Sequence, residues 1–133
     1  DGSIDCIATD HAPHQAELKE APFDEAPPGM LGLQTALSVA LTYLDLPPAR
    51  LVELMSTRPA ELMGARERHG GPLEVGRPAN LCVVDPEATW VVEPKALASL
   101  SHNTPYAGME LRGVVRHTVF EGEAVVIDGS AQR

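Results

Sequence analysis

The residues best suited to do chemistry gather near the start of the chain, in the run Ala8-Thr9-Asp10-His11-Ala12-Pro13-His14. This run brings one carboxylate and two imidazoles close together in the sequence. Asp and His side chains supply the oxygen and nitrogen ligands of metal sites, and the same groups transfer protons in acid–base catalysis. Because Pro13 excludes a regular helix through both histidines, they are not ligands one helical turn apart. A turn or a helix cap is the other interpretation that these residue types leave open.

An apolar run leads into this cluster and predicts a buried strand over residues 4–9. In α/β barrels the catalytic residues lie at the C-terminal ends of the strands, so this strand would deliver Asp10, His11 and His14 into an active site. Residues 11–30 then predict a long loop rich in Pro, Glu and Ala. Loops of that length are usually functional or disordered, so we expect a lid or a substrate loop here.

The rest of the chain predicts helices followed by short strands. Apolar residues at helical spacing indicate helices over residues 31–45 and 48–56, and a third from about Pro59 to Gly64. Short apolar runs then indicate strands over residues 80–85, 88–93, 111–120 and 123–127, the last two forming a hairpin across Glu121-Gly122. The fold class is therefore α/β, with the end of an α/β barrel in the first half and a small β module in the second.

Composition narrows the class of protein further. The chain has 133 residues, whereas a complete α/β barrel needs about 250. A net charge of −9 without a basic cluster argues against nucleic acid as a partner. No apolar run approaches the ~20 residues that span a bilayer, and no signal peptide is visible, so we expect a cytoplasmic protein with no membrane partner. The two cysteines, Cys6 and Cys82, are expected to be buried thiols.

The run from Ala8 to His14 resembles the last-strand signature of bacterial dihydroorotases (class I type) of the amidohydrolase superfamily. Related cyclic amidases often keep the Asp-His pair but lack the Ala-Pro-His that follows, so this block is specific. Four further blocks extend the resemblance in order along nearly the whole chain: residues 27–36, 56–60, 76–81 and 103–106.

The resemblance implies that the chain is the C-terminal part of a metal-dependent TIM-barrel hydrolase. Residues 1–66 are then the end of the barrel, with the active-site strand and the substrate loop, and residues 67–133 are the C-terminal portion of a composite β-sandwich domain. The implied reaction is the reversible, metal-dependent conversion between dihydroorotate and N-carbamoyl-aspartate in de novo pyrimidine biosynthesis.

The same resemblance assigns roles to single residues. Asp10 is implied to be a metal ligand and the general acid/base, and His14 to hold the carboxylate of the substrate. Pro28 and Gly29 match the loop that touches the substrate through backbone groups, although many relatives have an aromatic residue where Pro28 stands. His11 receives no ligand role.

One or two zinc ions are implied, with most ligands outside this chain, because the chain contains no His-x-His pair. Its start, without Met, is expected to be a cut, and the isolated chain is predicted to be inactive. Open edges of the Val-rich strands also predict poor solubility or partial unfolding of the chain alone.

Two alternatives remain open. The first is another cyclic amidohydrolase of the allantoinase or hydantoinase type, in which a neutral ring replaces the carboxylate-bearing substrate. The second is an inactive dihydroorotase-like partner of aspartate transcarbamoylase. Besides the small-molecule substrate, a homodimer and a transcarbamoylase complex are the partners that the resemblance leaves to be tested.

Overall fold

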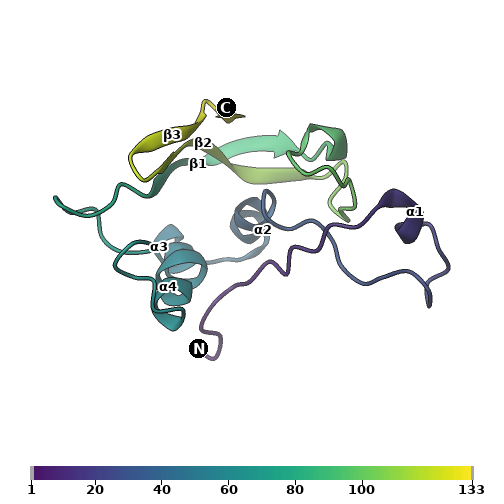
Figure 1. Cartoon of the computed structure of the whole chain (residues 1–133), viewed down its shortest axis with the longest axis horizontal. Coiled ribbons are helices and arrows are strands. Elements are labelled where there is room, and N and C mark those ends of the chain that lie inside the picture. Colours follow the sequence, from purple (N-terminus) through teal and green to yellow (C-terminus); the bar gives the residue numbers. More distant parts are fainter. Residues whose placement is uncertain (1, 133) are drawn as a thin grey trace.

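A four-stranded antiparallel sheet lies over a group of helices in the computed structural model, which describes residues 2–132 (Figure 1). Its strands follow the chain order: β1 (Leu81–Val91), β2 (Glu110–Phe120), β3 (Glu123–Ile127) and β4 (Ser130–Ala131). The predicted hairpin between β2 and β3 is confirmed. Glu121 and Gly122 have φ of 51° and 88° at its turn, as a tight turn between twisted strands requires.

The two strands predicted over residues 80–85 and 88–93 are one strand, β1, with an irregularity between Asp85 and Thr89. Pro86 has no N–H to donate to a ladder, so it lies where the pairing with β2 is interrupted. The Asp85 carboxylate replaces the missing partner, because its Oδ1 accepts the N–H groups of Glu87 (3.2 Å) and Ala88 (3.1 Å). The Asp85 side chain therefore connects the two segments that the sequence pattern predicts as separate strands.

The first predicted helix is shorter than expected, and the second and third are continuous with each other. The helix expected over residues 31–45 is α2 (Ala36–Tyr43). The other two form one run, α3 (Pro48–Val52), the π-helical η1 (Glu53–Thr57) and α4 (Arg58–Leu62). The wider π turn precedes Pro59, whose ring would otherwise clash with the carbonyl one turn earlier. Gly64, at φ 66°, follows the end of α4 as predicted.

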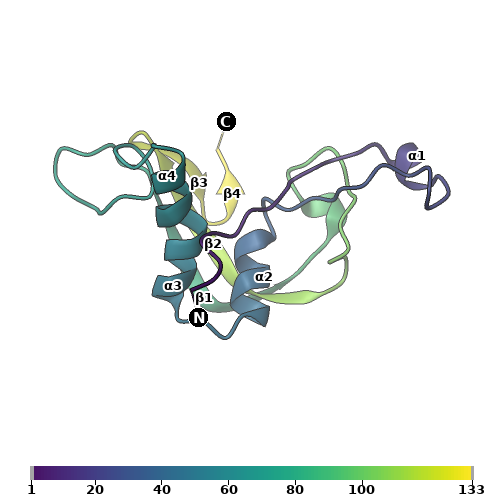
Figure 2. The same ribbon diagram turned by 90° about the horizontal axis from the view of Figure 1, so that it is seen from below.

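The strand predicted over residues 4–9 is wrong for this structure, where the segment is irregular. A strand needs a neighbouring strand for its backbone groups, and none lies beside this segment within residues 2–132. Ile7 instead donates its N–H to the Leu54 carbonyl (2.9 Å). The predicted loop over residues 11–30 contains one regular element, the short helix α1 (Ala16–Lys19). This helix lies away from the sheet in Figures 1 and 2.

Helix α2 packs against β2 and joins the two layers. Its Ser38 hydroxyl donates to the Gly113 carbonyl (2.7 Å) and accepts from the Trp90 indole (3.0 Å). Leu41 and Leu51 are buried in the core beside this contact. The sheet is therefore fixed to the helix that follows the substrate loop.

Both cysteines are free; Cys6 is half-buried, and Cys82 is exposed on the edge strand β1, so the prediction of two buried thiols is wrong. Within residues 2–132, no helix is long and apolar enough to cross a membrane.

Candidate active site

Asp10 follows the irregular segment of residues 4–9 and has an unusual backbone conformation. Its φ of 43° is in the left-handed region, which non-glycine residues rarely adopt and which Asp tolerates better than most. The residue is exposed. Unusual backbone conformations often occur at functional sites, so the φ of Asp10 is consistent with a functional role for this residue.

The substrate loop returns to this point at Met30. His11 and Met30 form an isolated parallel bridge, and the Ala12 N–H donates to the Met30 carbonyl (2.9 Å). Gly29 therefore lies beside the backbone that follows Asp10. A Cβ on Gly29 would come within 2.6 Å of the Ala12 Cβ, and its φ is 126°, so only glycine fits here.

His14 contacts the same loop. Its Nε2 lies 2.9 Å from the Pro28 carbonyl oxygen, which can only accept, so Nε2 is the protonated nitrogen in this arrangement. The structure thus brings His14, Pro28 and Gly29 together. In this neutral tautomer Nδ1 has no hydrogen, so His14 must leave Pro28 before its Nε2–H can donate to a substrate carboxylate.

His11 has a structural contact instead. Its Nδ1 accepts the N–H of Gly32 (3.1 Å) and lies 3.4 Å from the N–H of Leu33. A lone pair used in this way is not free for a metal ion. This contact supports the interpretation that His11 has no ligand role.

Sequence reasoning missed two residues that touch the loop. The Lys19 ammonium donates to the carbonyls of Pro27 (2.7 Å) and Gly29 (3.2 Å), and the Asn103 amide donates to Gly29 (2.7 Å). Asn103 lies in the segment 103–106, which resembles the dihydroorotase family, but the sequence does not indicate its contact with Gly29. Lys19 carried no signal beyond being a cation in an acidic loop.

The residues that could hold a metal ion form an incomplete set. Asp10 offers an exposed carboxylate, a suitable oxygen donor for zinc. Within the described part of the chain, however, no three His, Cys, Asp or Glu residues are grouped so as to hold a metal ion. A zinc site takes about three or four protein ligands, so Asp10 fits as one ligand of a site and not as a site by itself.

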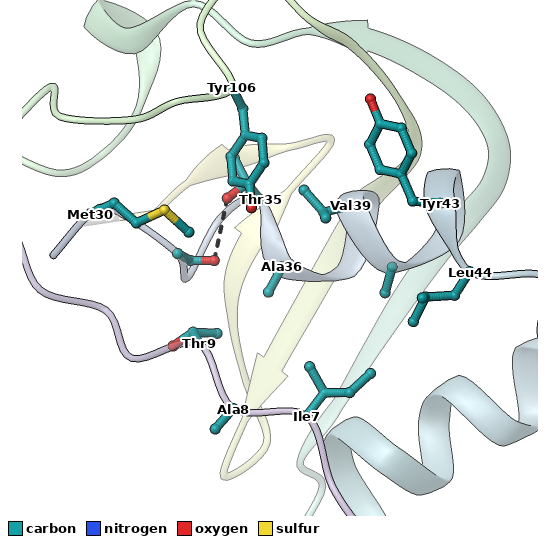
Figure 3. Close-up of a pocket in the computed structure, with 12 residues that line it drawn as sticks. Ile7, Ala8, Thr9, Met30, Thr35, Ala36, Val39, Tyr43, Leu44 and Tyr106 are labelled. Atoms are coloured by element: carbon teal, nitrogen blue, oxygen red, sulfur yellow. Dashed lines mark hydrogen bonds between the residues drawn. The ribbon is translucent and has the colours of Figure 1, made fainter. Parts of the chain in front are cut away.

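Two of the cavities that border this region differ in chemistry. One of about 190 Å³ lies between the first segment and α2 and is mainly apolar, with Ile7, Val39 and Tyr43 among its walls (Figure 3). The other, of about 730 Å³, is lined by His14, Lys19 and Asn103. A charged ligand needs polar partners, so only the second suits one.

The sequence model of the amidohydrolase family matches residues 1–125, so the chain belongs to the amidohydrolase family. The described α/β arrangement agrees with two solved structures. A D-hydantoinase from Thermus sp. has a TM-score of 0.89 at 28% identity, covering 98% of this chain and 30% of its own. An L-hydantoinase from Arthrobacter aurescens has a TM-score of 0.88 at 33% identity, with the same coverage.

More specifically, curated relatives are named dihydroorotase, as the resemblance predicts. The Mycobacterium leprae protein is 50% identical over 127 residues, covering 92% of this chain and 29% of the relative. The Mycobacterium tuberculosis protein is 48% identical over 133 residues, covering 97% and 31%. The chain therefore spans about three-tenths of the length of these relatives.

Proposed function

We propose that these residues form the C-terminal part of a dihydroorotase, which interconverts dihydroorotate and N-carbamoyl-aspartate. The observation that carries the proposal is the convergence of His14, Pro28 and Gly29 beside Asp10. The relatives named dihydroorotase support it, because they match this chain almost throughout.

In this proposal residues 1–66 are the end of a TIM barrel and residues 67–133 are part of a β-sandwich. The similarity to the hydantoinase structures supports a barrel-type hydrolase. The close packing of α2 on β2 explains how the sheet can remain attached to the barrel. The first segment, irregular here, becomes a barrel strand once neighbouring strands are present.

Asp10 is proposed as a zinc ligand and as the general acid/base. Zinc, when bound, lowers the pKa of water and polarises the amide carbonyl of the substrate. Asp10 takes and returns the proton exchanged during hydrolysis and ring closure. Its exposed carboxylate, at a residue with a φ of 43°, can reach a group outside these residues.

The substrate carboxylate is proposed to bind the Gly29 N–H and His14. The carbonyl and N–H of a trans peptide point in opposite directions, so the Gly29 N–H points away from His14 while His14 binds the Pro28 carbonyl. In this proposal His14 therefore leaves Pro28 when both groups bind the same carboxylate. Among residues 2–132 this N–H has no acceptor. Neither Pro27 nor Pro28 has an N–H, so Gly29 carries the first free backbone donor of the segment.

The test is turnover by the full-length protein loaded with zinc. We expect hydrolysis of dihydroorotate, with Asp10→Asn lowering kcat by about 10²-fold or more, because a positioned acid/base contributes that much. We expect His14→Ala mainly to raise KM for dihydroorotate, and His69→Ala, a matched control, to change neither constant. A zinc-loaded wild-type protein that leaves dihydroorotate unchanged refutes the proposal.

A hydantoinase-type cyclic amidohydrolase is the second candidate, favoured by the two solved structures. Its ring bears no carboxylate, so the wild type would then prefer hydantoin or dihydrouracil to dihydroorotate and tolerate His14→Ala. An inactive dihydroorotase-like protein would turn over none of these. A homodimer and an aspartate transcarbamoylase complex remain predictions, checked by the mass of the full-length protein alone and after mixing.

A further inference from the structure

We propose that Lys19 and Asn103 are positioning residues that hold the Pro27-Pro28-Gly29 segment in the orientation needed for substrate binding. They act through the backbone, by fixing the two peptide units on either side of the Pro28–Gly29 peptide, whose N–H is proposed to face the substrate carboxylate. The identity of that substrate rests on the proposed function above.

Three consecutive carbonyls in this segment accept hydrogen bonds from side chains. The Pro27 carbonyl accepts from Lys19 (2.7 Å) and the Pro28 carbonyl from His14 (2.9 Å). The Gly29 carbonyl accepts from Asn103 (2.7 Å) and from Lys19 (3.2 Å). His14 and Lys19 belong to the same loop as the tripeptide, whereas Asn103 comes from the connection before β2, so two separate parts of the chain converge on this segment.

The segment needs such donors because it cannot organise itself. Its two prolines have no N–H, and Gly29 adopts a φ of 126° that few other residues reach. Fixing the carbonyls on either side of the Gly29 Cα sets the planes of both adjoining peptides, since each peptide unit is planar. The direction of the free Gly29 N–H follows from these planes.

Asn103 holds the segment on both sides of Met30. Its amide binds Gly29, while its own carbonyl accepts the Leu31 N–H (2.9 Å). The nearby Ser101 hydroxyl donates to the His14 carbonyl (2.5 Å). The connection that precedes β2 therefore fixes the substrate loop from the side of the sheet.

Lys19 has no competing partner that explains its position. Among the ion pairs of residues 2–132, none includes Lys19, although two glutamates are close in sequence. Its half-buried ammonium directs two donors to loop carbonyls. These two contacts hold the loop, although Lys19 also lines the larger cavity.

The experiment measures KM and kcat for dihydroorotate in the full-length, zinc-loaded protein. Lys19→Met keeps the length of the side chain and removes its donors. We expect KM to rise about tenfold and kcat to change by less than about threefold, because only binding of the carboxylate is weakened. Lys19→Arg, which keeps donors, is expected to restore KM to within about threefold of the wild type.

Two further variants sharpen the test. Asn103→Asp replaces the amide donor with a carboxylate that repels the Gly29 carbonyl, so KM should rise as in Lys19→Met. Lys95→Met, at the other lysine of the chain and exposed on η2 (Pro94–Ala96), should leave both constants unchanged. An unchanged KM in Lys19→Met, or an equal fall of kcat in Lys19→Met and Lys19→Arg, overturns the proposal.

Amide hydrogen exchange separates this inference from the proposed function. Gly29, Met30 and Leu31 are expected to exchange faster in Lys19→Met than in Lys95→Met, whatever the enzyme's substrate. If wild-type protein does not act on dihydroorotate but exchange still rises, the proposed function fails and the positioning role stands. Equal exchange in the two variants overturns the positioning role, and Lys19→Gln replaces Lys19→Met if the latter does not fold.

Discussion

At the scale of single residues, the candidate site depends on backbone conformations as much as on side chains. Asp10 and Gly29, at φ 43° and 126°, lie side by side through the bridge of His11 with Met30. Both conformations are costly for ordinary residues, and both occur where two segments of the chain run closely side by side. The chemistry of the site is therefore sensitive to changes that add no charge and remove none.

Gly29→Ala tests this sensitivity. The new methyl group meets the Ala12 Cβ at 2.6 Å and the backbone is strained at φ 126°, so we expect a loss of about 1–3 kcal/mol in stability and a raised KM. Thermal unfolding and steady-state kinetics measure the two effects. Gly76→Ala is the matched control, because Gly76 has a φ of 91° but no atom within 4 Å of its Cβ position. Equal effects at both glycines would show that strain alone, and not the close contact, matters.

Asp85 provides a prediction about pH. The Arg116 side chain, and after it the Ala88 N–H, lowers the pKa of this exposed carboxyl. A lowered native pKa means that the carboxylate stabilises the fold above its unfolded pKa of about 3.9 and that this contribution is lost as the pH falls through the native value. Asp85→Asn should therefore melt at a lower temperature than the wild type at pH 7. In strong acid, where Asp85 is protonated, the two melting temperatures should be close. A constant difference across this range would contradict the assignment.

At the scale of elements, the contact of α2 with the sheet holds the two halves of the chain together. Ser38 is buried, with 4% of its surface exposed, and its hydroxyl serves both the Gly113 carbonyl and the Trp90 indole. Gly113 allows the close approach, since a Cβ there would come within 2.3 Å of the Leu41 Cδ1. One polar group and one glycine thus fix the distance between helix and strand.

Ser38→Ala should weaken this contact. The change leaves two partners without their hydrogen bonds, so we expect a loss of about 1–3 kcal/mol in the free energy of unfolding. Denaturant titration of the full-length protein measures it, with the exposed Ser130→Ala as control. A loss that matches the control would mean that water replaces the hydroxyl.

The elements also show what the sequence could predict. The β2–β3 hairpin followed from alternating valines and a Glu-Gly turn, because these signals are local. The strand predicted over residues 4–9 is absent, because a strand needs a neighbouring strand and none lies beside this segment among residues 2–132. The division of β1 was wrong because the Asp85 side chain bridges the interruption at Pro86.

The site shows the same limit. Asp10, His14 and Gly29 could be selected because their types carry chemical meaning and stand in a specific motif. Lys19 and Asn103 bind backbone carbonyls, which every residue has, so no pattern of residue types reveals such contacts. Only the folded loop shows which carbonyls they reach.

At the scale of the whole molecule, much apolar surface is unpaired. Large apolar side chains such as Ile4, Leu33 and Leu44 are 67%, 67% and 41% exposed, and β1 lies at an edge of the sheet. Such surfaces usually mark contacts with further protein. The described residues therefore have the properties of a part of a larger assembly.

The 133 residues alone should not hydrolyse dihydroorotate when zinc is added. No group of three metal-ligand side chains occurs within residues 2–132, so we expect no stoichiometric zinc and no turnover above background. Metal analysis and an activity assay of the purified chain check this, with the full-length protein as the positive control. We also expect association or a broad thermal transition; zinc-dependent turnover or a sharp cooperative transition in a monomer would contradict the prediction.

The hydrogen bond from the Trp90 indole to the Ser38 hydroxyl affects how the results of mutational screens should be interpreted. Trp90 lies on β1, far along the chain from Asp10, yet it helps fix the helix that follows the substrate loop. In a growth selection, substitutions at Trp90 or Gly113 would score as loss of function and be mistaken for defects in the chemistry. Measuring protein abundance beside growth would separate them, because these variants should be depleted in the cell whereas Asp10→Asn should accumulate normally.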